Sequence, residues 1–103
     1  MARAVSGDTD RRLLRLAEGD NVLITTTSIP AGEELLVDGQ LVELAVPVAL
    51  GFKLAASDLE EGAVAVRFGM PIGRTTEAVA RGALVHTHNL ESLYLRTHAR
   101  GEQ

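Results

Sequence analysis

Cysteine is absent from the 103 residues of this chain. Its absence excludes disulfides, thiolate zinc sites, iron–sulfur clusters held by this chain's own thiolates, and cysteine nucleophiles. A chain without cysteine fits a reducing compartment, although the absence is compatible with any compartment. The length corresponds to a single domain, and a domain of this size has room for a real core but little room for a deep enzyme cleft.

Aromatic residues are also scarce, at 3% of the sequence, whereas hydrophobic residues make up 46%. The composition is that of a globular chain, and its core has to be built from Val, Leu, Ile and Ala. So few aromatics offer no stacking platform for single-stranded nucleic acid. The formal net charge of −4 also argues against a nucleic-acid partner, because such proteins usually present a basic face.

Long hydrophobic runs are missing too. No stretch approaches the roughly 20 apolar residues needed to cross a bilayer, and the opening MARAVSGDTDRR has no apolar segment typical of a signal peptide. We therefore expect a cytoplasmic protein that does not bind membranes. Small polar residues without an apolar period predict a disordered leader over residues 1–11, followed by the folded domain over 12–92 and a C-terminal tail over 93–103.

Short β-like runs separated by turns make up most of the remaining sequence. Two such runs, Leu13–Ala17 and Val22–Thr27, flank a tetrapeptide of turn-forming residues. The segment LLVDGQLVEL is the clearest hairpin, because Asp38-Gly39 suits a type I′ turn that needs positive φ at both central positions. Open strand edges of so small a sheet can pair with another copy of the chain, which makes a homo-oligomer an option.

A loose internal repeat also runs through the chain. Four segments share the form apolar-x-x-Gly-x-x-apolar, namely IPAGEEL, VALGFKL, LEEGAVA and VARGALV. Each predicts a tight turn in which glycine supplies a positive φ, followed by a strand. The pattern favours a mainly β domain of short strands with long connections. At most one or two short helices are expected, with TTEAVA (75–80) and the segment after Asn89 as the candidates.

Two histidines close together in LVHTHNLES are the first candidate site. If Ala83–His88 is a strand, His86 and His88 project from one face about 7 Å apart and can converge on one metal at roughly 2.1 Å per bond. Imidazole is also suited to proton transfer near neutral pH. The alternative is plain polar surface on a solvent-facing strand. Two imidazoles do not complete a metal shell, so further donors have to come from another chain or from substrate.

Lys53 and Arg74 are candidates for binding an anionic substrate. Arginine can bind a carboxylate bidentately, although for both residues a solvated surface position is the commoner role. The run DLEEG (58–62) places three carboxylates in a turn. It is more typical of a solvated loop than of a general acid/base pair, because catalytic carboxylates need burial or close pairing to shift their pKa.

Taken in order, GDNVLI, IPAGEEL with VDGQLVEL, and VALGFKLAASDLEEGAVAVRFGMPIGRTTEAVARGALVHTHNLES resemble the SAF-type domain of the altronate and galactarate dehydratase family. They also resemble the small subunit of sulfolactate sulfo-lyase, from the same group. The resemblance covers about residues 13–92. Its most specific pieces are FGMPIGRTT, similar to the family's Y-G-x-x-I-G-x-A, and VHTHN, similar to its V-H-x-H-N.

The resemblance implies a β-clip-like fold and a role beside a much larger catalytic part. Together the two parts eliminate water or sulfite from a sugar acid or a small hydroxy acid, and the dehydratases usually carry iron or another divalent metal. With the chain ending at Gln103, the larger part is expected to be another polypeptide, namely a separate large subunit that shares the metal, or to be missing. The resemblance implies that His86 and His88 are catalytic or metal-binding, and that Lys53, Arg74 and Asn89 bind substrate.

One position departs from the family pattern. The family commonly has G-H-K where this chain has Gly51-Phe52-Lys53, and Phe52 can neither bind metal nor move a proton. Either the substrate or the activity is altered, or Phe52 simply packs in the core or at an interface. The competing hypothesis is a non-catalytic ligand-binding or docking module of the same fold, since fold alone does not decide function.

Overall fold

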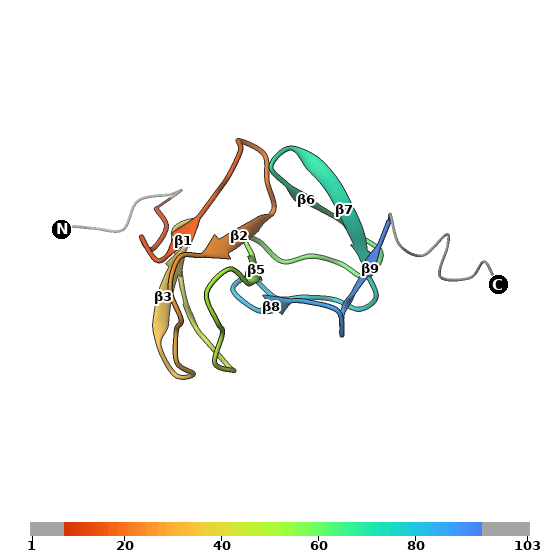
Figure 1. Cartoon of the computed structure of the whole chain (residues 1–103). Coiled ribbons are helices and arrows are strands. Elements are labelled where there is room, and N and C mark those ends of the chain that lie inside the picture. Colours follow the sequence, from red (N-terminus) through yellow and green to blue (C-terminus); the bar gives the residue numbers. More distant parts are fainter. Residues whose placement is uncertain (1–7, 94–103) are drawn as a thin grey trace.

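All regular secondary structure of the computed structural model, which describes residues 8–93, is β-strand, and this confirms the predicted mainly β fold. Nine short strands form three small antiparallel sheets (Figure 1). Their bounds are β1 Leu13–Leu14, β2 Val22–Thr25, β3 Glu34–Val37, β4 Gln40–Glu43, β5 Lys53–Ala55, β6 Val64–Arg67, β7 Met70–Thr75, β8 Leu84–Val85 and β9 Leu90–Ser92. Within this part of the chain, no helix exists that could cross a membrane.

The largest sheet has the strand order β1-β2-β5-β8, so it joins segments that are distant in the sequence. The hairpin β3–β4 and the three-stranded sheet β6-β7-β9 lie to either side of it in Figure 1. Because neighbouring strands of the central sheet are separated by long connections, the chain crosses over itself repeatedly. This arrangement agrees with the short strands and long connections that the turn spacing predicts.

Two tight hairpins have positive φ at both turn residues. Asp38 and Gly39 join β3 to β4 with φ of 46° and 86°, which confirms the predicted type I′ turn. Phe68 and Gly69 join β6 to β7 with φ of 55° and 75°. Phenylalanine is uncommon in that conformation, and for this reason the sequence pattern did not reveal the second hairpin.

The four glycine segments are arranged as two pairs. Ile29 of the first bridges Val48 of the second, and Leu59 of the third bridges Val79 of the fourth, both antiparallel. The four glycines have φ between 83° and 89°, as predicted. The repeat is therefore real in three dimensions, and it brings turns from both halves of the chain together in pairs.

A buried threonine closes each pair of turns. The Thr25 hydroxyl donates to the carbonyl of Ala49 at 2.8 Å and accepts from the Phe52 N–H at 3.1 Å. In the other pair, the Thr75 hydroxyl donates to the carbonyl of Glu60 at 2.7 Å and accepts from the Ala63 N–H at 3.1 Å. Thr25 lies four residues before Ile29, and Thr75 lies four residues before Val79. The same hydrogen-bond arrangement therefore occurs twice.

The hydrophobic core has two clusters, one on each face of β5. Leu54 belongs to the first cluster, against which Phe52 packs, whereas Ala55 belongs to the second, with Val85. Aliphatic side chains fill both clusters, as the aromatic-poor composition requires. Because side chains alternate along a strand, Lys53 does not share the side of β5 from which Phe52 packs against the first cluster.

Three local expectations from the sequence differ from the structure. Residues 8–11 of the predicted leader are held to the β3–β4 hairpin, since the Asp10 N–H donates to Leu36 O at 2.7 Å and the Gly39 N–H to Asp8 O at 2.7 Å. TTEAVA is the end of β7 and a bend, not a helix, and the segment after Asn89 continues as β9. The rest of the leader and of the tail lies outside the described residues.

Candidate functional site

The histidine segment is a tight turn and not the predicted strand, because β8 already ends at Val85. The Asn89 N–H donates to the carbonyl of His86 at 3.0 Å. The buried Asn89 side chain accepts from the His86 N–H at 2.9 Å and donates to the carbonyl of Leu84 at 2.9 Å. Asn89 therefore holds the turn closed from inside, and strand alternation does not decide where the two imidazoles point.

The His86 ring stacks on Phe52, with centroids 4.8 Å apart and 22° between the ring planes. His86 and Phe52 are both half-buried. Phe52 also packs against the first core cluster, so it supports one face of the imidazole from the core. Of the two interpretations left open by the sequence, the packing role of Phe52 is the one that the contacts describe.

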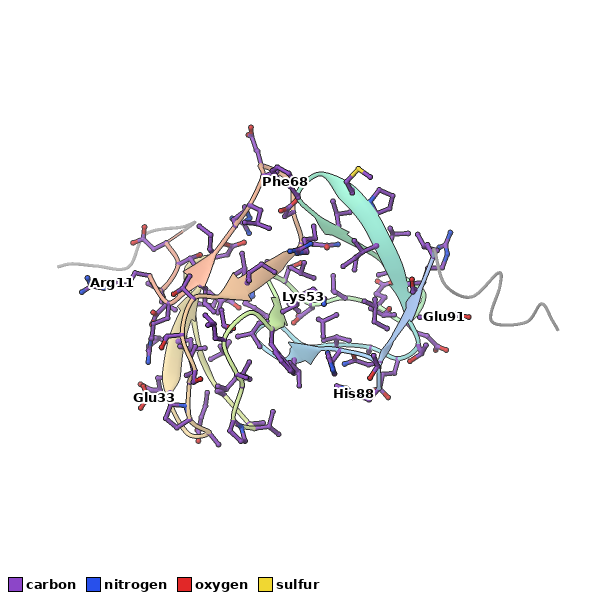
Figure 2. The ribbon with its side chains drawn as sticks, viewed as in Figure 1. Arg11, Glu33, Lys53, Phe68, His88 and Glu91 are labelled. Atoms are coloured by element: carbon purple, nitrogen blue, oxygen red, sulfur yellow. The ribbon has the colours of Figure 1, made fainter. Side chains whose placement is uncertain are left out.

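The second histidine lies in different surroundings. His88 is exposed and lines a cavity of about 500 Å³ together with Asn89, Glu77 and the segments 44–47 and 78–80. Figure 2 shows His88 at the lower edge of the molecule, beyond β8. Within residues 8–93, no group of three or more His, Cys, Asp or Glu side chains is placed to hold a metal ion. The turn can therefore supply at most part of a metal site.

Lys53 of β5 lies in another cavity, of about 310 Å³, to which β6, β7 and β9 also contribute residues. Figure 2 shows it near the centre of the molecule, between the strands. Burial, followed by the nearby positive charge of Arg67, lowers the pKa of Lys53 below its usual value. Arg67, at the end of β6, lines the same cavity.

Arg74 is placed apart from this pair. It is exposed on β7, and its guanidinium donates to the carbonyl of Gly62 at 3.3 Å. The carboxylates of DLEEG behave as the solvated loop that was predicted: Asp58, Glu60 and Glu61 are exposed, and Asp58 accepts the N–H of Arg81 at 2.9 Å. The segment 88–92 connects the two cavities, because His88 lines the first while Leu90 and Ser92 line the second.

Gly73 of β7 lies directly beside β9, the strand that follows the histidine turn. β9 crosses β7 so closely that a Cβ on Gly73 would lie 2.5 Å from the carbonyl oxygen of Glu91 and 2.9 Å from Cγ of Leu90. Only glycine therefore lets the strand that follows the histidine turn pair with β7. Through this contact β7 sets the position of the turn.

Sequence reasoning missed Arg67 and Asp20. In the sequence, Arg67 is only a cation at the end of a predicted strand. The fold places it beside residues of β5, β7 and β9 in the Lys53 cavity. Asp20 is 4% exposed, and its carboxylate accepts the N–H groups of Phe68 at 2.8 Å, Gly69 at 2.9 Å and Ala17 at 3.0 Å. Burial alone would raise its pKa, but these three donors outweigh it and lower the pKa. Its place among turn formers in GDN was the only sequence signal.

Comparison with known proteins places this arrangement in context. Residues 11–93 match the family model described as the altronate/galactarate dehydratase SAF domain. The altronate dehydratase of Escherichia coli (strain K12) is 40% identical over 70 residues, which are 68% of this chain and 14% of that protein. The altronate dehydratase of Bacillus subtilis (strain 168) is 28% identical over 82 residues, covering 80% of this chain and 16% of the relative.

A third relative is a subunit of a different lyase. The (2R)-sulfolactate sulfo-lyase subunit alpha of Chromohalobacter salexigens is 35% identical over 51 residues, covering 50% of this chain and 52% of the relative. This chain thus spans only a small part of the altronate dehydratases that it matches and about half of the sulfo-lyase subunit.

Proposed function

Because this chain belongs to the altronate/galactarate dehydratase SAF domain family, we propose that it is the small subunit of a sugar-acid dehydratase. In this proposal a separate, larger subunit supplies most of the active site, and this domain completes it. The observation that carries the proposal is the turn His86–Asn89, which the buried Asn89 side chain holds closed and whose His88 and Asn89 line a cavity. A rigid turn of this kind can present imidazoles to a partner's active site.

The reaction class requires a proton to be removed from a carbon of the sugar acid while a neighbouring hydroxyl leaves as water. His86 and His88 are the groups that we assign to this proton transfer, since imidazole can accept and donate a proton near neutral pH. Phe52 fixes one face of the His86 ring by stacking. The ring is therefore oriented before substrate binds, which favours reaction geometry.

A divalent metal, with iron as the first candidate, is part of the proposal only as a shared cofactor. The described residues form no complete metal site, and the histidine turn offers two imidazole donors at most. The remaining ligands would come from the larger subunit. When bound, such a metal would act as a Lewis acid toward an oxygen of the substrate.

The test is to produce this chain together with the polypeptide encoded beside its gene. We expect the two to co-purify and to release a 2-keto acid from altronate or galactarate, measured with a carbonyl reagent. His86→Ala and His88→Ala are expected to lower kcat by at least about 100-fold, the usual scale for losing a general acid or base. Full activity in the double variant would refute the histidine assignment, and lack of association would refute the subunit assignment.

A matched control for these variants is Thr87→Ala. Thr87 lies between the two histidines and is exposed, so its loss should leave kcat unchanged if the imidazoles carry the effect. A domain that co-purifies with the larger chain but whose histidines have no effect would instead be a non-catalytic docking or ligand-binding module.

Sulfite elimination is the second candidate reaction. Among the three relatives named above, this chain covers 52% of the sulfo-lyase subunit but only 14% and 16% of the two altronate dehydratases. The same complex should therefore be assayed for sulfite release from sulfolactate. Sulfite release without 2-keto acid formation from sugar acids would favour this second reaction over dehydration.

A further inference from the structure

The cavity that contains Lys53 and Arg67 has properties of its own. It lies where β5 faces the β6-β7-β9 sheet and is lined by Gly51, Lys53, Arg67, Ile72, Leu90 and Ser92. Two cations thus share one small space with two apolar side chains. A volume of about 310 Å³ is at the small end of the range for ligand pockets, and it suits a compact ligand.

Neither cation forms an ion pair with another described residue. Arg12 forms ion pairs with Asp10 and Glu33, both at 2.8 Å, and Arg15 pairs with Asp38 at 2.7 Å. By contrast, no ion pair or side-chain hydrogen bond of Lys53 or Arg67 occurs within residues 8–93. The chain contains 14 acidic residues against 10 basic ones, yet none of the described acidic side chains forms an ion pair with Lys53 or Arg67.

Two like charges that converge without a counter-ion are unfavourable: the partial burial of Lys53 and, after it, repulsion from the exposed Arg67 lower the pKa of Lys53. An anion bound between them would remove both penalties. The guanidinium of Arg67 offers a planar pair of N–H donors that matches a carboxylate, whereas the ammonium of Lys53 acts as a compact charge. Ile72 and Leu90 give the cavity one apolar wall.

We propose that Lys53 and Arg67 form a carboxylate-binding pocket that holds one end of a small sugar acid. The ligand's identity as a sugar acid rests on the proposed function, whereas the anion pocket rests on the two cations alone. Arg67 replaces Arg74 in this assignment, because Arg74 donates to the Gly62 carbonyl on the exposed face of β7. Ser92 and Leu90 tie the pocket to the strand that follows the histidine turn.

The pocket lies wholly within this chain, so the isolated, isotopically labelled full chain is the right sample. Galactarate is titrated into it at constant ionic strength, and backbone amide and lysine side-chain NMR signals are followed. We expect saturable shifts in the millimolar range at Gly51, Lys53, Arg67 and Ser92, together with a rise in the Lys53 pKa. The neutral polyol galactitol and inorganic sulfate are titrated in parallel.

Each result has a defined meaning. Saturation by galactarate without a response to galactitol supports the pocket. An equal response to sulfate would overturn the carboxylate assignment in favour of a general anion site, and no saturable response to galactarate would overturn the pocket itself. Binding by the isolated chain in the absence of any lyase activity with the larger subunit would refute the proposed function while leaving the pocket intact, so the two failures are distinguishable.

Substitutions give an independent test. Arg67→Gln and Lys53→Met are each expected to weaken galactarate binding at least about 10-fold, the scale of one charge-assisted contact. Arg67 is exposed, so the Arg67→Gln variant should fold even if Lys53→Met does not. Arg74→Gln is the matched control on the neighbouring strand and should bind as the unaltered chain does. Equal weakening by Arg74→Gln and Arg67→Gln would overturn the assignment.

Discussion

Asp20 shows how a single buried carboxylate can determine a turn that lies far away in the sequence. Its two oxygens accept N–H groups from Phe68 and Gly69, 48 and 49 residues away. These donors stabilise a turn in which phenylalanine has a positive φ of 55°, a conformation that costs an L-residue about 1–2 kcal/mol. Backbone N–H groups, with a smaller contribution from the nearby charge of Arg15, satisfy the charge of Asp20, so it has a structural role and is not a free catalytic acid.

Asp20→Asn is expected to destabilise the domain by about 2–3 kcal/mol. The amide nitrogen of asparagine cannot accept a hydrogen bond, so at least one of the three N–H donors loses its partner. Urea unfolding at neutral pH measures the change. Glu18→Gln is the control, since Glu18 is an exposed carboxylate two residues away; an equal loss in both variants would contradict the proposed role of Asp20.

The repeat glycines offer a matched pair of substitutions. Gly32 and Gly82 have φ of 89° and 83°, but a Cβ at Gly32 would meet nothing within 4 Å, whereas one at Gly82 would collide with Val42. Gly32→Ala should cost about 1–2 kcal/mol for the backbone conformation alone. Gly82→Ala should cost about 1–3 kcal/mol more because of overpacking. Equal unfolding free energies would show that β4 does not pack on this turn in solution.

At the scale of elements, the turn His86–Asn89 depends on one side chain. Asn89→Ala removes both the acceptor for the His86 N–H and the donor to the Leu84 carbonyl. We expect kcat of the assembled lyase to fall because the imidazoles lose their position, while Asn89→Asp, which keeps the acceptor, retains more activity. The pH profile should keep its shape, since Asn89 does not titrate. An unchanged kcat in Asn89→Ala would contradict a positioning role.

The hairpins and turns show how far sequence reasoning reaches. Asp38-Gly39 and the four repeat glycines were predictable because local chemistry alone fixes their φ. The Phe68-Gly69 turn was not predictable, because a carboxylate about fifty residues away stabilises it. For the same reason the Lys53–Arg67 cavity was missed: residues from β5, β6, β7 and β9, which are distant in the sequence, line it together. The histidine motif was recognisable in the sequence. The strand predicted for it was wrong, because the Asn89 side chain closes a turn there, and strand alternation does not predict such a turn.

For the whole molecule, three carboxylates make stability depend on pH. The hydrogen bond from Arg12 lowers the pKa of Asp10, and the one from Arg15 lowers the pKa of Asp38, in both cases against the effect of burial. The pKa of Asp20 is lowered as well. Groups whose pKa is lowered on folding contribute stability above the unfolded value of about 3.9 and lose it as the pH falls through the folded value.

We therefore expect the unfolding free energy to be nearly constant from pH 7 to 5 and to fall steeply below about pH 4. Urea unfolding across this range measures the effect. The double variant Asp10→Asn with Asp38→Asn should show a shallower acid slope, with only a modest loss at pH 7 because both ion pairs are partly exposed. An unchanged acid slope would mean that other groups control acid unfolding.

The close crossing of β9 over Gly73 also ties the strand that follows the histidine turn to β7. β9 has three residues and pairs with β7 from Gly73↔Ser92 to Thr75↔Leu90. We therefore expect β9 to open more readily than the central sheet, as short segments with few backbone hydrogen bonds do. Amides of Leu90–Ser92 should exchange with solvent faster than those of β2 and β5. A dehydratase site completed by this turn would then switch on and off with local opening of one strand, while the rest of the domain stays folded.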